Sequence, residues 1–517
     1  MQTEVLIVGA GPTGLSLAAQ LIRYGVDFII VDEKQGVTEL SKAIVVHART
    51  LEIYDQIDLA QTAIERGAIA HNAAIMNEGK IQAQLDFTDF GKDLSPFPFV
   101  LMLEQSKNEQ LLDEFLQSSE KKVWWQTELE GLARDEQGIT ATVKSASGER
   151  QPIEAKYIVG CDGASSKTRH LLNLGFEGET DARLFYVADV DMKTELNHET
   201  LHLVFGSDAF VIFFPMQGEK HWRLIGNLPE FEENKNEDFK YEEIENKVKA
   251  LARIPLDITN VRWFSTYKIH TRHAEKFSNG RGFLAGDAAH IHTPAGGQGM
   301  NTGIQDSYNL AWKLAFVLKD KADESLLETY NEERLENAKR LLRTTDEMFE
   351  FGAGEEWYFR IFREKILPAL AKFAFHFKAA KQFIFPLISQ IGISYDKSSL
   401  SRHNSHEVFK IKAGNRFPYF AADGKSLFEN LSAPKCHLIV FSDGNTDLSA
   451  VETVVAEKYA ALIDYKTIPL YPHIAEIFGT NKTFSVFVRP DGHVGFITRE
   501  NPIDELDKYL TENLKIK

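Results

Sequence analysis

Hydrophobic and polar residues at the start of the chain follow two periods that predict a strand, a helix and a second strand. Residues 4–8 are an apolar run, apolar side chains recur every three to four positions over residues 12–24, and residues 26–32 are again almost continuously apolar. A continuous apolar run is typical of a strand that a parallel sheet buries on both faces. Gly25 stands where such a helix ends. The pattern therefore predicts a βαβ unit.

The same periodicities predict further elements along the chain. We expect helices at residues 108–116, 300–319, 324–349 and 502–514, and a helix pair within the aromatic-rich stretch 361–395. We expect strands at residues 127–143, 157–160, 183–192, 201–205, 210–214, 222–225, 437–441, 484–488 and 493–498. The strands between 176 and 275 are separated by turn residues and form a β-rich insertion in the first unit.

These elements predict an α/β protein built from several domains. At roughly 100–200 residues per domain, a chain of 517 residues holds about three. We expect a discontinuous Rossmann-like domain of residues 1–175 and 276–345 with an inserted β-sheet domain of residues 176–275. A helical connector of residues 346–405 and an independent C-terminal domain of residues 406–517 follow.

Composition and charge exclude several classes of protein. The net charge of −17, without a dense lysine or arginine cluster, argues against a nucleic-acid partner. Lysines interrupt the apolar stretch 361–395, so it lacks the ~18 apolar residues of a membrane span. The only cysteines, Cys161 and Cys436, predict neither a disulfide framework nor a cysteine-based metal site. With a strand that begins at residue 4, leaving no room for a signal peptide, we expect a cytoplasmic protein.

The first motif lies between the first strand and the first helix. Gly9, Gly11 and Gly14 have the GxGxxG spacing, in which the glycines allow a tight turn, the approach of a pyrophosphate and close helix–strand packing. An acidic residue should follow about 20 residues later to bind a ribose hydroxyl. Glu33, which follows Asp32 at the end of the second strand, is our candidate. The motif predicts a dinucleotide site, although a glycine-rich turn can also serve packing alone.

The second motif lies far downstream and has similar chemistry. A short apolar strand ends in Gly286-Asp287, and a loop of small residues leads into a long helical pattern. A carboxylate at the end of a buried strand needs a partner, such as a ribityl or ribose hydroxyl or a helix N-terminus. Backbone N–H groups at a helix start attract negative charge, so Met300 and Asn301 are candidates to stabilise a reduced flavin. The loop residues that we expect at the cofactor are Pro294, Gly297 and Gly299.

Three segments together identify a family resemblance. Residues 9–14, 161–163 and 286–301, in this order and spacing, resemble the single-component FAD-dependent aromatic hydroxylases, the group A flavoprotein monooxygenases with the para-hydroxybenzoate hydroxylase fold. The resemblance implies FAD as cofactor and NAD(P)H as co-substrate. It also implies capture of O2 as a C4a-hydroperoxyflavin and transfer of one oxygen atom to an aromatic substrate. It requires no second Rossmann motif for NAD(P)H.

Individual positions carry over from this family. Pro12 and Thr13 match the segment beside the pyrophosphate, Gln105 matches a glutamine that contacts FAD, and Asp162 matches the aspartate of a motif that serves both FAD and NAD(P)H. Lys42 stands where the family usually has arginine, and lysine keeps the charge but loses the bidentate fork. Arg49 matches an arginine of the larger phenol and polyketide hydroxylases, and a surface ion pair is its alternative role.

The C-terminal segment resembles the thioredoxin-like domain of the same larger hydroxylases. The family's Gly-Asp-Arg appears here as Gly414-Asn415-Arg416. A Cys-x-x-Cys motif is absent from the sequence and Cys436 stands alone, so thiol–disulfide exchange is not expected. Packing or association is the expected role of this domain, and a homodimer stays open.

Sequence motifs indicate the catalytic groups less clearly than they indicate the cofactor site. A dry cavity protects a reactive flavin adduct from water, and its expected lining is Phe205, Phe210, Phe213 and Phe214. A base that deprotonates a phenol would assist the reaction, and the candidates are His47, His202, His221 and Tyr267. His290 and His292 have i, i+2 spacing but belong to the flavin loop, so we expect no metal.

The resulting hypothesis is an FAD monooxygenase that hydroxylates an aromatic or polycyclic small molecule. Three alternatives remain open. The same chemistry could inactivate an antibiotic scaffold of the tetracycline or rifamycin type. A flavin reductase or oxidase would insert no oxygen, and a redox-sensing protein would keep FAD without turnover.

Overall fold

The computed structural model describes residues 1–517 apart from several gaps. The gaps are residues 40–42, 88–89, 136–137, 207–208, 228–239, 294, 354–361, 363–365, 368, 370–377, 404–407 and 423–424. Two residues expected at the cofactor, Lys42 and Pro294, lie outside the described residues, as do residues 361, 363–365, 368 and 370–377 of the helix pair expected at 361–395.

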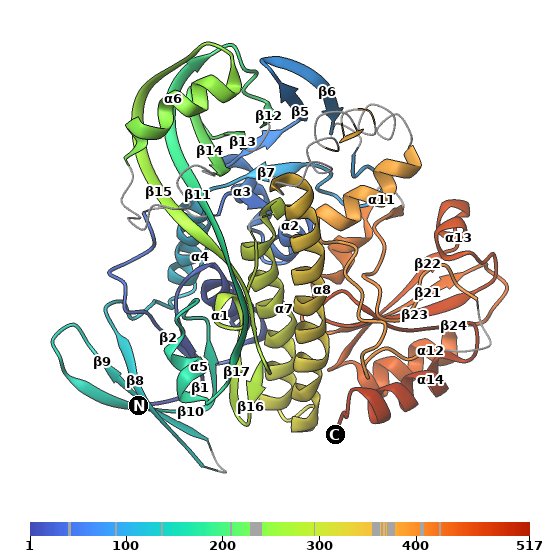
Figure 1. Ribbon diagram of the computed structural model, residues 1–517. Coiled ribbons are helices and arrows are strands. Elements are labelled where there is room, and N and C mark those ends of the chain that lie inside the picture. The colour runs from blue at the N-terminus through green and yellow to red at the C-terminus, as the bar shows by residue number, and fades with distance from the viewer. Residues whose placement is uncertain are drawn as a thin grey trace.

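The first sheet forms the lower left of Figure 1. Its elements are β1 (Gln2–Val8), α1 (Pro12–Tyr24), β2 (Phe28–Val31), β8 (Glu128–Arg134), β9 (Ile139–Lys144), β10 (Arg150–Gly160), β16 (Ser278–Asn279) and β17 (Gly282–Leu284). The strand order is β16-β17-β10-β1-β2, and β1 pairs in parallel with β10 and β2. Gly25 ends α1 in the left-handed conformation, as its position predicts. The βαβ opening is therefore confirmed, and β17 returns beside β10 from far downstream.

A second sheet of eight strands forms the top of Figure 1. It contains β5 (Asn72–Asn77), β6 (Lys80–Asp86), β11 (Phe176–Thr194), β12 (Thr200–Phe205), β13 (Phe210–Pro215), β14 (His221–Asn227), β15 (Leu256–Ala274) and β18 (His290–Ile291), in the order β18-β15-β11-β14-β13-β12-β5-β6. The strands expected between 176 and 275 are present. Two further strands come from residues 72–86, which the sequence analysis assigned to the first domain.

One face of this sheet is covered by a helix that the sequence analysis did not predict. Helix α6 (Tyr241–Ala252) packs its apolar side chains into a cluster that includes Tyr186, Trp222 and Phe213. Tyr241, Ile244 and Val248 have helical spacing, so the signal was present within a range that was read only as β-rich. On the other face of the sheet, Phe214 packs against Ile44 and Val45 of the N-terminal part of the chain.

Helices occupy the middle of the molecule. They are α2 (Ala48–Asp55), α3 (Ala60–Arg66), α4 (Gln105–Ser118), α7 (Gln298–Leu318) and α8 (Glu328–Ala353), with the short strands β3 (Val45–Val46), β4 (Ala68–Ala70) and β7 (Val100–Met102) between them. Helix α5 (Lys167–Leu171) lies with the first sheet at the lower left of Figure 1 and contacts β8 and β10. Helices α7 and α8 stand beside each other in Figure 1. Helix α7 packs on α1, and its stripe of Ile304, Tyr308 and Trp312 belongs to the main hydrophobic core. Helix α11 (Lys378–Ile388) follows farther along the chain.

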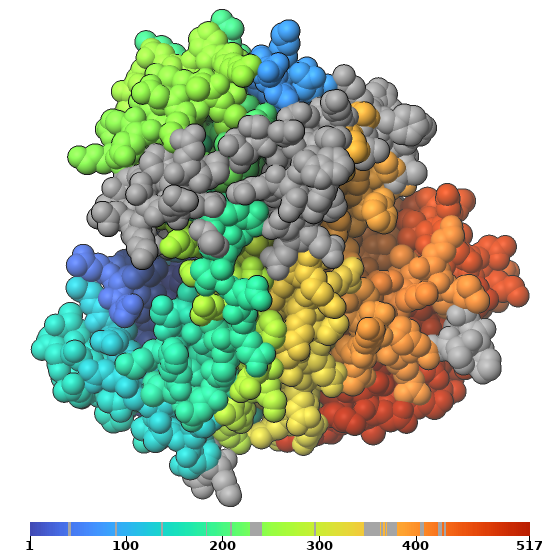
Figure 2. Space-filling view, in the orientation of Figure 1, coloured from blue at the N-terminus to red at the C-terminus, as the bar shows by residue number. Residues whose placement is uncertain are grey.

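The C-terminal unit packs against α8 on the right of the molecule (Figure 2). Its elements are β21 (Cys436–Ser442), α12 (Ser449–Val454), β22 (Ile463–Pro469), α13 (Pro472–Phe478), β23 (Phe484–Val488), β24 (Val494–Thr498) and α14 (Pro502–Lys508). The sheet has the order β22-β21-β23-β24, with one parallel and two antiparallel pairs. The three strands expected here are confirmed, whereas the thioredoxin-like classification stays a prediction.

Both cysteines are buried and unpaired. Burial is the main cause that raises the pKa of Cys161 and of Cys436. Neither thiol forms a thiolate readily, which agrees with the absence of exchange chemistry expected from the sequence.

Candidate cofactor site

The three glycines of the N-terminal turn have different reasons to be glycine. Gly9 has φ +101°, and a Cβ there would lie 2.5 Å from the carbonyl carbon of Cys161. A Cβ on Gly14 would overlap the carbonyl oxygen of Gly9. A Cβ on Gly11 would meet no atom within 4 Å. Gly9 and Gly14 therefore serve packing, whereas Gly11, the N-cap of α1, borders open space that a pyrophosphate can occupy.

The two glycine segments meet at Thr13. The Ser307 hydroxyl on α7 donates to the Thr13 carbonyl oxygen at 2.7 Å. Gly286 has φ +61°, and a Cβ on it would lie 3.1 Å from the Cβ of Thr13. A Cβ on Gly303 of α7 would lie 3.2 Å from the Gly286 Cα. Three backbone segments thus converge around one threonine, and a dinucleotide along the first segment can reach the second.

The two carboxylates after β2 have separate tasks. Asp32 is buried and accepts hydrogen bonds from the backbone N–H of Ala10 at 2.6 Å and of Lys34 at 2.8 Å. This carboxylate therefore closes the turn. Glu33 is exposed beside it, which leaves its carboxylate accessible to a ribose hydroxyl, as the sequence analysis predicts.

Asp162 and Asp287 lie in different environments. The Asp162 carboxylate accepts from the Ser166 hydroxyl at 2.5 Å and from the Thr168 backbone N–H at 2.9 Å, so it shapes the turn before α5. Gly163 after it has φ +76° and open space at its Cβ. Asp287 is exposed, so the expectation of a buried carboxylate at this position is wrong. The contact of Asp287 with a ribityl or ribose hydroxyl stays a prediction.

The N-terminus of α7 is built on left-handed glycines. Gly296 and Gly297 have φ +71° and +64°, and Gly297 is the N-cap of the helix. The Asn301 side chain accepts from the His47 backbone N–H at 2.9 Å and donates to the Val45 carbonyl at 2.8 Å. The Asn301 side chain therefore ties α7 to β3. Only the backbone N–H groups of this first turn, which includes Gly299 and Met300, remain for a cofactor.

Two residues carried over from the family have protein partners. Gln105 begins α4, and its backbone N–H donates to the Ala43 carbonyl at 3.0 Å. Arg49 is buried, donates to Glu52 at 3.0 Å and to the Asp491 carbonyl at 2.6 Å, and its guanidinium carbon lies 5.6 Å from the centre of the Tyr308 ring. This linkage to the C-terminal unit explains the burial of Arg49 without a cofactor and replaces the surface ion pair considered for it.

His47 is a buried imidazole beside the cofactor loop. Burial lowers its pKa to about 4, against opposing hydrogen bonds with the backbone of Gly296 and Gly297. Its Nε2 has no partner among the described residues. A group with this pKa is neutral at pH 7 and a weak base, so His47 suits hydrogen bonding better than proton abstraction.

This depressed pKa predicts acid sensitivity. Between pH 6.5 and pH 4 the unfolded chain binds a proton at His47 that the folded chain does not, so stability falls as the pH falls. We expect the wild type to lose about 2 kcal/mol more unfolding free energy between pH 7 and pH 5 than His47→Gln. Urea unfolding at the two pH values measures the difference, and parallel losses in both proteins would contradict the assignment.

The other three candidate bases lie on strands of the second sheet. His202 is buried, with its Nε2 3.1 Å from the Asn197 carbonyl, which is a structural contact. Burial lowers the pKa of His221, whose Nε2 has no partner among the described residues. Burial raises the pKa of Tyr267, so this phenol does not act as a base near neutral pH. An unpartnered ring nitrogen therefore does not single out His221, because His47 Nε2 and His202 Nδ1 also have no partner among the described residues.

The four expected cavity phenylalanines separate between the two faces of the sheet. Phe213 is fully buried in the cluster under α6, so its place in a substrate cavity is excluded. Phe205 packs with Ile75 and Ala83 near the edge of the sheet, and Phe210 packs against the same cluster. Phe214 packs against Ile44 and Val45, the strand that also contacts Gly297. The face of the sheet that carries Phe214 is therefore the one directed toward the cofactor loop.

The same face carries a buried ion pair. Arg223 donates from Nε and Nη2 to the Asp189 carboxylate at 2.6 and 2.7 Å. Its Nη1 donates to the Ala43 carbonyl at 3.3 Å. The pair links the second sheet to the segment that Gln105 holds, and the sequence motifs gave no signal for it.

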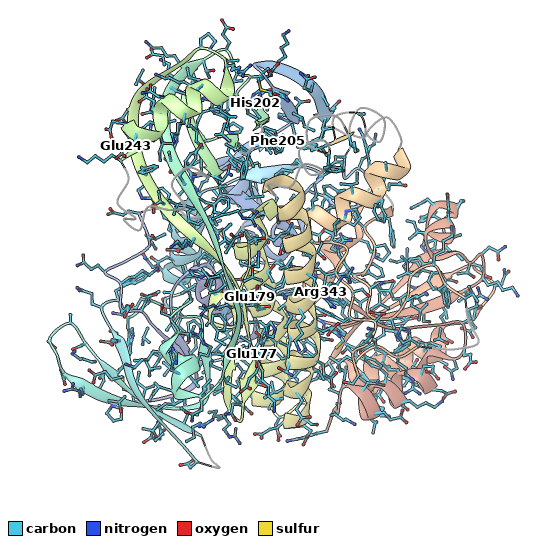
Figure 3. The ribbon with its side chains drawn as sticks, viewed as in Figure 1. Glu177, Glu179, His202, Phe205, Glu243 and Arg343 are labelled. Carbon is cyan, nitrogen blue, oxygen red and sulfur yellow. The ribbon has the colours of Figure 1, made fainter. Side chains whose placement is uncertain are left out.

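A cavity of about 600 Å3 lies between the long strands β11 and β15 and helix α8. In Figure 3, Glu177 and Glu179 mark its β11 side, and Arg343, next to the lining residue Leu342, marks the α8 side. Thr293, at the start of the cofactor loop, also lines it. Its volume is within the range of small-molecule sites.

Comparisons with known proteins agree with this geometry. Residues 2–345 match the family model described as "FAD binding domain". The chain belongs to this FAD-binding family. FAD is therefore the cofactor. The open space at Gly11 fits its pyrophosphate, and the first turn of α7 fits its pyrimidine edge. The exposed carboxylates of Glu33 and Asp287 fit its hydroxyl groups. No helix of the described residues is long and apolar enough to cross a membrane.

Three relatives of this FAD-binding chain illustrate the family. The 6-methylpretetramide 4-monooxygenase of Streptomyces rimosus is 34% identical over 66% of this chain, which spans 61% of that protein's length. The rifampicin monooxygenase of Streptomyces venezuelae is 30% identical over 95% of this chain and 94% of its own. The solved structure of OxyS anhydrotetracycline hydroxylase from Streptomyces rimosus has a TM-score of 0.76 and 27% identity, covering 100% of this chain and 99% of its own.

Proposed function

We propose that this protein is an FAD-dependent monooxygenase that consumes NAD(P)H and O2 and hydroxylates an aromatic or polycyclic small molecule. The observation that carries the proposal is the convergence of the two glycine segments on Thr13. Phe214 of the second sheet packs against Val45, which lies beside Gly297 of the second glycine segment. The similarity to named monooxygenases supports it. The unpaired cysteines fit a cytoplasmic location.

Different residues of the chain would bind different groups of FAD. The open backbone at Gly11 would admit the pyrophosphate to the N-terminus of α1. Glu33 would accept a hydrogen bond from a ribose hydroxyl, and Asp287 would accept one from a ribityl hydroxyl. The first turn of α7, at Met300 and Asn301, would offer its N–H groups and the positive end of the helix dipole to the pyrimidine edge of the flavin. Bound FAD supplies hydride acceptance and oxygen activation.

The second sheet provides the opposite wall of the site. Its face with Phe214 and Ile225 lies toward β3 and the cofactor loop, and these apolar side chains exclude water from the space between them. The Arg223–Asp189 pair sits within this face and holds it against Ala43. His221 on the same strand offers an open Nε2 that can hold or accept a proton of a phenol.

A substrate screen tests the proposed function. The purified protein should carry the absorbance bands of bound FAD and oxidise NAD(P)H slowly. A matching phenol or polyketide should accelerate this oxidation and incorporate one atom from labelled O2 into the product. Ligand-stimulated oxidation without incorporation would identify a reductase or oxidase, and the absence of any stimulated oxidation would favour a sensing protein.

A second candidate substrate class is an antibiotic scaffold. The similarity to the rifampicin monooxygenase extends over 95% of this chain, including the C-terminal unit. The same assay with a rifamycin and a tetracycline separates this candidate, because the chemistry is shared and only the ligand that stimulates NAD(P)H oxidation differs.

A further inference from the structure

A buried carboxylate behind the cofactor site joins three separate segments. Asp306 on α7 is fully buried. Its Oδ2 accepts from the Gly286 backbone N–H at 2.9 Å and lies 2.7 Å from His290 Nε2. Its Oδ1 accepts from Arg334 Nε on α8 at 2.6 Å. Both carboxylate oxygens are thus fully engaged within the protein.

The charge of this carboxylate is retained despite its burial. Burial alone would raise the pKa of Asp306, but the Arg334 charge, His290 and the Gly286 N–H hold it below its usual value. Arg334 is also buried and donates from Nη2 to the Thr302 carbonyl of α7 at 3.1 Å. Replacing a buried ion pair by apolar residues is often no less stable, so its presence points to a need for a defined geometry.

The three segments held by Asp306 are those that frame the cofactor loop. Gly286 immediately precedes Asp287, which is exposed and which we propose to contact the cofactor. His290 lies on β18, which leads directly into the loop. Asp306 itself lies about two turns along α7 from Met300. One carboxylate therefore fixes the distance between the turn at Asp287 and the first turn of the helix.

The hydrogen bond from the Gly286 backbone N–H to Asp306 holds the backbone of the turn, and not a side chain, against α7. Gly286 donates its N–H to Asp306 while its own backbone is in the left-handed conformation, with φ +61°. In that conformation Gly286 also contacts Thr13 of the N-terminal segment. Losing the carboxylate would free the turn and separate the two parts of the cofactor site without removing any group that contacts FAD.

We propose that Asp306 is a positioning residue that sets FAD affinity by locking the Gly286-Asp287 turn onto helix α7. This inference rests on the proposed placement of FAD along residues 286–301. Asp306 does not touch the cofactor, and it acts through Gly286 and His290. The sequence analysis missed it because its partners lie 16 to 28 residues away and follow no local motif.

The test compares Asp306→Asn with Glu333→Gln. The amide at position 306 keeps the shape of the side chain but loses its charge and one acceptor oxygen. Glu333 lies on α8 next to Arg334, but its buried ion pairs are directed to Lys313 and Arg489. The dissociation constant of FAD is measured by flavin fluorescence, and apoprotein stability by thermal unfolding. We expect Asp306→Asn to weaken FAD binding by about 10- to 100-fold and Glu333→Gln to leave it unchanged.

Two results would overturn the proposal. One is wild-type FAD affinity in Asp306→Asn. The other is an equal loss of FAD affinity in both variants, because affinity would then follow stability rather than the geometry of the turn.

If Asp306→Asn does not fold, the variant His290→Phe tests the proposal instead, since phenylalanine can stack on Phe277 as the imidazole does. We expect it to weaken FAD binding and to change the visible circular dichroism of the flavin, and unchanged values would overturn the proposal. A wild type that binds no FAD would instead reject the proposed function.

Discussion

Replacing Arg489 by methionine is expected to lower the free energy of unfolding by about 3–5 kcal/mol. Arg489 is fully buried and donates to the Glu333 carboxylate at 2.6 and 3.1 Å and to Asp491 at 3.1 Å. Its loss leaves two buried carboxylates without their main cation. The Arg489 charge and Lys313 hold the pKa of Glu333 at about 2 despite its burial. Urea unfolding monitored by circular dichroism measures the loss.

Arg150→Met is the matched control for this effect. Arg150 pairs with Glu130 at 2.5 Å, but its side chain is 63% exposed. Water and salt screen such a pair, so we expect no measurable change in stability. Equal stability of the two variants would show that the buried ion pairs around Glu333 contribute no more to the free energy of unfolding than the exposed Arg150–Glu130 pair.

Replacing Gly11 by valine is expected to weaken FAD binding by at least about 100-fold, which corresponds to about 2.7 kcal/mol. Gly11 has φ −80° and ψ −173°, an extended conformation that suits a β-branched residue. Its Cβ would enter open space, so the apoprotein should unfold at the wild-type temperature. The branched side chain would instead occupy the space that the pyrophosphate needs. Equilibrium dialysis with FAD and thermal unfolding of the apoprotein measure the two effects separately.

Gly131→Val is the control for the glycine substitution. Gly131 lies on β8, and a Cβ there would make only ordinary contact with Thr142, at 3.8 Å. We expect normal FAD affinity from this variant. Wild-type affinity in Gly11→Val would show that the pyrophosphate does not pass this turn, and the assignment of the N-terminal site would then be wrong.

The features that the sequence predicted well are those with a local cause. The apolar run of β1, the helical stripe on α1 and the glycine at position 25 each act within a few residues of their own position, so their pattern is visible in a linear chain. The long helix after Gly297 is predictable for the same reason. The roles of Gly11, Glu33 and Asp287 at the cofactor stay predictions that the geometry supports.

The features that were missed depend on partners far away in the chain. The addition of β5 and β6 to the second sheet depends on pairing with β12, more than 100 residues downstream. The engagement of Arg49 by Asp491 spans 442 residues. The burial of Asp287 was inferred from its strand alone, and only the three-dimensional arrangement shows that Asp306 is the buried carboxylate. Tertiary contacts of this kind leave no periodic signal.

The return of β17 to the first sheet has a consequence for biosynthesis. A ribosome delivers β1, β2 and β10 long before residue 282, and until then one edge of β10 lacks its parallel neighbour. The Arg489–Glu333 contact can form only later still, after residue 489 has been synthesised. The nascent polypeptide therefore carries an incomplete first sheet until residue 284 has been synthesised, and a chain that stops before residue 489 would lack the Arg489 partner of Glu333 on α8.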